Sequence, residues 1–464
     1  MTTRVERDTL GEVQVPAEAL WGAQTQRAAE NFPISGLRAF PAFIRATARI
    51  KRAAAIANAR AGRLEAELRD AIVASCDEII AGQHHGQFVV DVFQAGAGTS
   101  HNMNANEVIA NLAEERLGGR RGRYERVGPN DHVNMAQSTN DVTPTAIRLA
   151  LLELTRPLCE ELEALGGAFA AKALDYEGCV KPGRTHLQDA VPVTFGQEFG
   201  GWASRMRSAA SRIRAGRAEL CELGIGGTAA GTGLNADPEF GRRVCEELAR
   251  STGEPIVPAS DLFASMQSTA AFLRISSGMR TASVELSSIA NDIRLMVSGP
   301  RTGFGELLIP AVQPGSSIMP GKVNPSIAEM VDQVCYQVIG NDTAVMLGAQ
   351  AGQLELNVMM PGMNFALEFS ATILTTATRT FRERCVEGMR VDEQRAQELL
   401  DASPSLVITA LAPHIGYARS AALVKRALAE RRTLMEVALE ERILPEADLR
   451  RVLDPLPMTR GGVQ

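Results

Sequence analysis

Hydrophobic residues recur at helical spacing along a long stretch that contains no proline. Between residues 259 and 299, apolar side chains lie three, four, six or seven positions apart: Leu262, Met266, Leu273, Met279, Leu286, Ile289, Ile293 and Met296. This spacing places them along one side of a helix. A helix of about 38 residues would be ~57 Å long. Segments 193–237, 326–360 and 362–403 also lack proline, which favours further long helices, although glycines cluster near the end of the first.

The stretch 259–299 carries very little charge. Its only charged residues are Asp261, Arg274, Arg280, Glu285, Asp292 and Arg294. A long helix with so few charges cannot be solvated on every side, so we expect it to lie inside a helix bundle that forms between subunits.

These patterns predict a mainly all-α chain with three domains, because 464 residues are too many for one ordinary domain. We expect an N-terminal domain of helices and loops over 1–140, a central long-helix bundle over 141–390 and a small helical C-terminal domain over 391–464. Residues 4–7 and 13–15 are candidates for short strands.

Composition supports this fold class and excludes several functions. Apolar residues make up 45% and aromatic residues 5%, which favours helix packed on helix over a β-sandwich. The net charge of −6 comes from interspersed residues without a basic run, so we expect no nucleic-acid partner. No apolar stretch approaches the ~18 residues of a membrane span, and the N-terminus has no apolar signal core. The chain is expected to be cytoplasmic.

Cysteine and histidine placement gives no indication of a metal. The seven cysteines are scattered and never spaced as Cys-x-x-Cys, so we expect buried free thiols. The six histidines lack a metal-ligand spacing as well.

A polar loop is the most informative motif. Residues 315–325 read GSSIMPGKVNP, and the proline and glycines exclude a regular helix. Lys322 offers a charge for a carboxylate, Asn324 adds an amide donor, and the glycines leave backbone N–H groups free to hold an anion. On these residues alone, an ordinary surface turn is the alternative.

This loop resembles the signature of the aspartase/fumarase superfamily, closest to the aspartases, with class II fumarases next. Segments 98–104 and 137–141 together resemble a second site region of that family, and segment 183–189 resembles a third. The resemblance extends over nearly the whole chain. It implies a twenty-helix core in a homotetramer and active sites that gather these segments from three subunits. We expect no cofactor, because the elimination needs only acid–base groups and fixed charge.

The family chemistry explains the residue types. Elimination from a 2-substituted succinate removes a weakly acidic proton beside a carboxylate, and the carbanion is best held as an aci-carboxylate by fixed donors. The resemblance implies that substrate is bound by Thr99, Ser138, Thr139, Asn140, Thr185, Ser317, Lys322 and Asn324. The first four would form the donor array, and Lys322 and Asn324 would clamp the other carboxylate.

The residues alone do not assign the base, because a serine hydroxyl ionises far above pH 7. By resemblance, Ser316 is the catalytic base, and closure of its loop would stabilise the alkoxide. His186 is the other catalytic candidate, because histidine as a residue type suits proton transfer near neutral pH, and the family gives it a substrate-orienting role. Glu329 is expected to support His186 as its partner.

The flanking residues favour L-aspartate over L-malate as the substrate. Segments 94–100, 131–134 and 138–140 resemble aspartases, whereas 20–27 and 200–202 resemble fumarases. His101 matches the usual residue of neither, which leaves its role open. The leading prediction is therefore an aspartate ammonia-lyase that forms fumarate. A class II fumarate hydratase is the alternative, and an inactive structural homologue is the remote one.

A glycine-rich segment over 224–233 resembles a phosphate-binding loop. It lacks the Gly-Lys-Ser/Thr ending, and no predicted strand precedes it. We expect a closely packed break between helices there.

Overall fold

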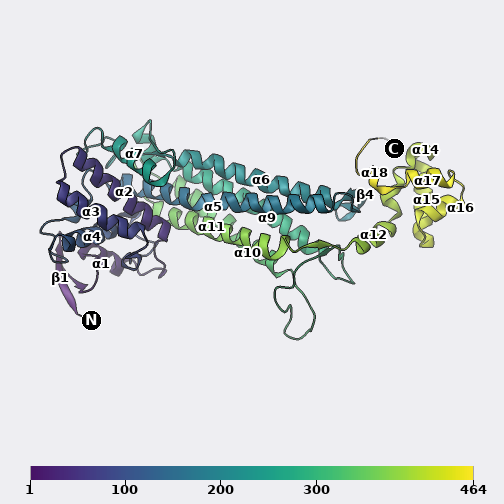
Figure 1. Ribbon diagram of the computed structural model, residues 1–464, viewed down its shortest axis with the longest axis horizontal. Coiled ribbons are helices and arrows are strands. Elements are labelled where there is room, and N and C mark those ends of the chain that lie inside the picture. The colour runs from purple at the N-terminus through teal and green to yellow at the C-terminus, as the bar shows by residue number, and fades with distance from the viewer. Residues whose placement is uncertain (1, 463–464) are drawn as a thin grey trace. The chain divides into compact units, whose positions relative to one another are not determined.

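The computed structural model describes residues 2–462 and is mainly helical, as predicted (Figure 1). Its α-helices are α1 Ala23–Asn31, α2 Pro41–Arg60, α3 Ala66–Ile80, α4 Thr99–Arg116, α5 Thr139–Asp175, α6 Phe195–Leu220, α7 Phe240–Thr252, α8 Leu262–Gln267, α9 Ala270–Met296, α10 Ser326–Gln350, α11 Met360–Phe381, α12 Glu393–Asp401, α13 Pro404–Ile408, α14 Ala412–Ile415, α15 Tyr417–Glu430, α16 Leu434–Glu440, α17 Glu446–Val452 and α18 Pro455–Met458. Among these residues, no helix is both long and apolar enough to cross a membrane.

The strands form four small pairs. They are β1 Thr3–Asp8 with β2 Gly11–Pro16, β3 Val180–Thr185 with β4 Gln188–Thr194, β5 Glu222–Leu223 with β6 Val257–Pro258, and β7 Leu307–Leu308 with β8 Arg390–Val391. The pair β5–β6 is parallel and the other three are antiparallel. The two short strands predicted near the N-terminus are therefore confirmed as β1 and β2.

By its internal contacts the chain divides into two compact units. The first unit comprises Met1–Glu160, Ala209–Ser283 and Cys335–Thr375, and the second comprises Glu161–Ser208, Val284–Val334 and Thr376–Gln464. Five long helices, α5, α6, α9, α10 and α11, contribute residues to both units. The division at 1–140, 141–390 and 391–464 stays a prediction.

In the first unit, α4 is buried from Ser100 to Glu114 although it carries several polar residues. The Glu107 carboxylate accepts hydrogen bonds from the backbone N–H groups of Gly22, Gln24 and Thr25 at 2.8–3.1 Å. These N–H groups begin α1, where helical backbone donors have no partner within the helix. Burial raises the pKa of Glu107, and the hydrogen bonds oppose that shift.

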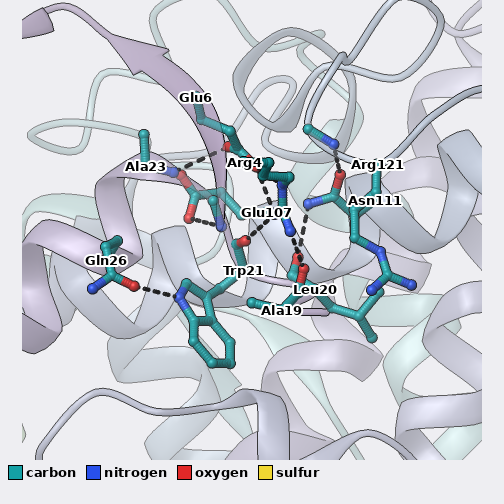
Figure 2. A network of polar contacts seen from close by, with 12 residues as sticks. Arg4, Glu6, Ala19, Leu20, Trp21, Ala23, Gln26, Glu107, Asn111 and Arg121 are labelled. Carbon is teal, nitrogen blue, oxygen red and sulfur yellow. Dashed lines mark hydrogen bonds and ion pairs between the residues drawn. The ribbon is translucent and has the colours of Figure 1, made fainter. Parts of the chain in front are cut away.

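Whereas Glu107 binds backbone N–H groups, the guanidinium of Arg4 binds backbone carbonyls. It donates to the backbone carbonyls of Pro16 and Ala17 at 2.9 and 3.0 Å. It also donates to those of Ala19 and Trp21, both at 2.7 Å (Figure 2). Buried backbone carbonyls need such donors, so Arg4 fixes a loop that has no regular structure.

The long helices are joined by polar contacts as well as by apolar packing. In the first unit, Asp342 of α10 accepts from Ser276 and Arg280 of α9 at 2.6 and 2.7 Å. In the second unit, Asp332 of α10 accepts in the same way from Ser287 and Arg294 of α9 at 2.7 and 2.9 Å. The same α9–α10 pairing therefore recurs ten residues apart on α10.

The prediction of one helix over 259–299 is wrong in one respect. The segment is interrupted at Ser268, which has extended backbone angles, and α9 starts at Ala270. The Ser268 hydroxyl accepts from the N–H of Ala270 at 3.3 Å and so caps α9. The apolar spacing continues across the break because Met266 of α8 is also buried.

The longest helix, α5, was not expected from proline placement. It runs for 37 residues and contains Pro144 and Pro157. Arg217 of α6 donates to the carbonyl of Leu152 at 2.6 Å and to the Thr155 hydroxyl at 2.8 Å, just before the second proline. Packing against a neighbouring helix thus supports a turn that the proline weakens.

His101 is a core residue of the first unit. Its ring stacks on Phe43 with centroids 4.3 Å apart, and its Nε2 lies 3.1 Å from the Thr47 hydroxyl. Burial, with a smaller contribution from the Lys51 charge, lowers the pKa of His101 to about 3. The imidazole is therefore neutral at pH 7.

This burial predicts an acid-sensitive contribution to stability. Because the pKa of His101 is lower in the folded chain than its ordinary 6.5, the contribution is present above pH 6.5 and is lost as the pH falls towards 3. Between pH 7 and pH 5 the loss should be about 2 kcal/mol per chain. His101→Gln should remove this loss, as measured by urea midpoints at the two pH values. His414→Gln, at an exposed histidine, should keep the wild-type pH dependence.

Candidate active site

The turn that starts α5 carries three of the predicted substrate-binding residues. The Ser138 hydroxyl accepts from the N–H of Asn140 at 3.2 Å, and the Ser138 N–H donates to Asp141 Oδ1 at 2.9 Å. This reciprocal cap places Thr139 and Asn140 at the positive end of a helix ~55 Å long. Such an end favours a bound carboxylate.

Thr99 starts α4, close to the same turn. Gly98, just before it, has a φ of +85°, and a Cβ there would lie 2.8 Å from the Thr143 hydroxyl of α5. Glycine therefore lets the start of α4 approach the first turns of α5. Asn102 of α4 donates from Nδ2 to the Thr139 hydroxyl at 3.1 Å, which links the two segments directly.

The glycine-rich segment packs against the opposite side of the turn, as expected of a closely packed break. Asp141 Oδ2 accepts from the N–H groups of Gly226 and Thr228 at 3.1 and 3.0 Å, and Asn140 Nδ2 donates to the carbonyl of Ala229 at 2.8 Å. Burial raises the pKa of Asp141 to about 6, and these hydrogen bonds and the Lys51 charge oppose the shift.

In the second unit, Thr185 and His186 lie at the tip of the β3–β4 hairpin. Thr185 pairs with Gln188, and His186 and Leu187 between them have positive φ angles of 54° and 59°. Two such residues form the tight turn that a two-residue hairpin loop needs, although non-glycine residues adopt it at a cost. The turn presents His186 to solvent in the single chain.

A buried ion cluster holds the first strand of this hairpin, β3. Glu306 is fully buried and accepts from both terminal nitrogens of Arg184 at 2.8 and 3.2 Å, and its carboxylate lies 3.6 Å from Lys181 Nζ. Arg184 also lies over the Phe304 ring, 4.2 Å from its centroid. These contacts hold β3, while the turn at His186 remains exposed.

The polar loop 315–325 closes on itself. The Gly315 N–H donates to the carbonyl of Lys322 at 2.9 Å, and Asn324 Nδ2 donates to the carbonyl of Gly315 at 2.7 Å. Ser316 Oγ accepts from the N–H groups of Ile318 and Met319 at 3.2 and 3.1 Å. These two donors point at the oxygen where an alkoxide would carry its charge.

The remaining predicted residues also lie in the second unit. Ser317 and Lys322 are exposed on the loop, and Glu329 is half-buried in the first turn of α10. Among residues 2–462 no hydrogen bond or ion pair joins Glu329 to His186, so their pairing stays a prediction. The single chain thus groups Thr99 with the α5 turn in the first unit and holds the other seven residues in the second.

Four residues behind the α5 turn were missed by the sequence analysis: the buried Lys51, Asn102 and Asp141, and the half-buried Asn134. Lys51 gave one usable signal, because it interrupts the apolar face of α2 between Ile50 and a run of alanines. The other three lie in motif segments, but nothing in the sequence shows that their side chains meet.

Comparison with known proteins shows the family of this chain. Residues 11–340 match a family model described as lyase, and residues 407–460 match one described as fumarase C C-terminus. The chain is 45% identical to an aspartate ammonia-lyase of Bacillus subtilis, over 99% of this chain and 97% of that protein. It is 48% identical to a class II fumarate hydratase of Ralstonia nicotianae, over 95% of each.

A solved structure gives the same result for the fold. The crystal structure titled fumarate lyase:delta crystallin from Brucella melitensis, bound to cobalt, superposes with a TM-score of 0.96 at 48% identity, covering 99% of this chain and 100% of that one. The motifs, the helical fold and the full-length matches lead to one conclusion: the chain belongs to the aspartase/fumarase superfamily of lyases.

Proposed function

We propose that this lyase eliminates ammonia from L-aspartate, reversibly, to give fumarate without a cofactor. The observation that carries the proposal is the pair of backbone N–H groups on Ser316 Oγ. They supply the stabilisation that a serine needs before it can act as a base near neutral pH. Aspartate is preferred because several full-length relatives, at 44–48% identity, are aspartate ammonia-lyases.

In this mechanism the Ser316 alkoxide takes a proton from the carbon beside one carboxylate of aspartate. The electron pair moves into that carboxylate, which becomes an aci-carboxylate with two negative charges. Thr99, Ser138, Thr139 and Asn140 donate hydrogen bonds to it, and the α5 N-terminus favours its charge. The pair then returns to form the carbon–carbon double bond as the carbon–nitrogen bond breaks and ammonia leaves.

The other predicted residues would hold the rest of the substrate. Lys322 and Asn324 clamp the second carboxylate, Ser317 and Thr185 add donors, and His186, supported by Glu329, orients the substrate. Asn324 hydrogen-bonds to Gly315 in the present loop conformation. Loop closure on substrate would therefore have to exchange that bond for one to the carboxylate.

The proposal includes a cytoplasmic homotetramer with a twenty-helix core and sites shared by three subunits. Large apolar side chains on the long helices support burial against other subunits. Val284 of α9 is 53% exposed in the single chain, and Tyr336 and Leu347 of α10 are 58% and 52% exposed. Apolar exposure of this kind is typical of a face that another chain covers.

One observation favours a second candidate, a class II fumarate hydratase. The Ralstonia relative of that name is 48% identical to this chain, as much as the aspartate ammonia-lyase of Pseudomonas aeruginosa. In that reaction L-malate loses water through the same base and the same aci-carboxylate.

The two candidates are separated by the ultraviolet absorbance of fumarate. Purified protein should raise this absorbance with L-aspartate and not with L-malate, and ammonia should appear in equal amount. A rise with L-malate alone would replace the aspartase assignment with the fumarase. No rise in absorbance with either substrate, in a folded protein, would contradict both candidate functions.

The base assignment predicts the effect of one substitution. Ser316→Ala should lower kcat by ~10²–10⁴-fold, the usual contribution of a positioned base, because no oxygen remains to accept the substrate proton. The neighbouring Ser317→Ala removes a hydroxyl of the same kind and should mainly raise KM. Steady-state kinetics of both variants test the assignment, which normal turnover by Ser316→Ala would refute.

A further inference from the structure

Lys51 is a buried cation in the first unit, placed directly behind the α5 turn. It is fully buried in α2, and its Nζ donates to Asn134 Oδ1 at 2.9 Å. Among residues 2–462, no carboxylate lies within ion-pair distance of it. Burial lowers the pKa of Lys51 to about 7, while the nearby Asp141 favours the charged form. A buried, unpaired cation is costly, so its retention calls for a reason beyond packing.

The hydrogen bonds between Lys51 and Thr139 fix which atom of each group donates and which accepts. Lys51 Nζ donates to Asn134 Oδ1, so Asn134 presents its oxygen to Lys51. The same oxygen accepts from Asn102 Nδ2 at 3.3 Å, so Asn102 must present its amide nitrogen on that side. The same nitrogen also donates to the Thr139 hydroxyl oxygen at 3.1 Å.

An orphaned atom supports this direction. The Oδ1 of Asn102 is buried and accepts no hydrogen bond within the described chain. A flipped Asn102 amide would point this oxygen at Asn134 Oδ1, which Lys51 already fixes as an acceptor. Asn102 therefore keeps its own oxygen without a hydrogen bond, because the flipped amide would place two acceptor oxygens, those of Asn102 and Asn134, against each other.

The Thr139 hydroxyl is left to donate its proton to a group other than Asn102. Its hydroxyl oxygen accepts from Asn102, and no acceptor for its proton lies within hydrogen-bonding distance among residues 2–462. A hydroxyl that accepts on its inner side is left to donate outward. Carboxylates accept and never donate when ionised, so an outward donor matches one.

We propose that Lys51 is a positioning residue that acts through Asn134 and Asn102 to make Thr139 a hydrogen-bond donor to a substrate carboxylate. The inference rests on the proposed function only in requiring that Thr139 faces a dicarboxylate. It extends that function by explaining why Thr139 donates a hydrogen bond. The cause is Lys51, which lies 88 positions away in the sequence.

The direction of the hydrogen bond between residues 102 and 139 can be reversed with an isosteric substitution. In Asn102→Asp the new carboxylate accepts the Thr139 proton and turns the hydroxyl away from substrate. The kcat/KM should fall by about 10²-fold, the effect of losing one transition-state donor. Thr139→Val should cause a similar fall. The double variant should be no worse than Thr139→Val alone, because both changes remove the same donor.

Asn134→Asp is the matched comparison, with the same chemical change one link earlier. Aspartate at 134 still accepts from Lys51 and from Asn102, so the direction is kept and the loss should be only a few-fold. Lys51→Met tests whether the orientation of the Thr139 hydroxyl depends on Lys51. Its loss of kcat/KM should also disappear in the Thr139→Val background, which a general loss of packing would not do.

Affinity for succinate, an unreactive dicarboxylate, separates failure of this inference from failure of the proposed function. The wild-type protein should bind succinate, and Asn102→Asp should bind it at least tenfold more weakly than Asn134→Asp does. Equal losses of succinate affinity in the two aspartate variants would overturn the proposed role of Lys51. So would losses of kcat/KM that add to that of Thr139→Val. A wild type that neither turns over a 2-substituted succinate nor binds succinate would instead overturn the proposed function.

Discussion

The reciprocal cap at the start of α5 is the interaction on which the first unit's part of the site depends. Asp141 takes three backbone N–H groups, one from the turn itself and two from the glycine-rich segment. On the other side, Lys51 reaches the turn through two amides. Buried Asp141 and buried Lys51 therefore both contribute to holding the same few residues. The side chains of Thr139 and Asn140 are held as well, by Asn102 and by the carbonyl of Ala229.

In the proposed mechanism the residues of the second unit enclose the substrate. The first strand of the His186 hairpin is held by the Arg184–Glu306 pair, and its tip is exposed. The loop with Ser316 is held by a few hydrogen bonds within itself, which can be exchanged as the loop closes. Rigid donors in one unit and a movable base in the other suit a reaction whose charge develops only after substrate is enclosed.

The sequence predicted the helical class, the two N-terminal strands and the close packing of the glycine-rich segment for physical reasons. Apolar periodicity reports which face of a helix is buried. It cannot detect the break at Ser268, because a capping serine looks like any other small residue on that helix. It also could not anticipate Pro144 and Pro157 inside α5, where contacts from a neighbouring helix support the turn. The link between Asn102 and Thr139 joins residues 37 positions apart, and spacing alone does not reveal it.

The central claim is that this site stabilises an aci-carboxylate. The nitronate of 3-nitropropionate carries two negative oxygens in the same arrangement, so its affinity tests the claim most directly. Complementarity to the intermediate predicts that the nitronate binds at least ~10²-fold more tightly than succinate. Thr139→Val should lose most of that advantage. Equal affinities for nitronate and succinate in an active wild-type protein would contradict the account.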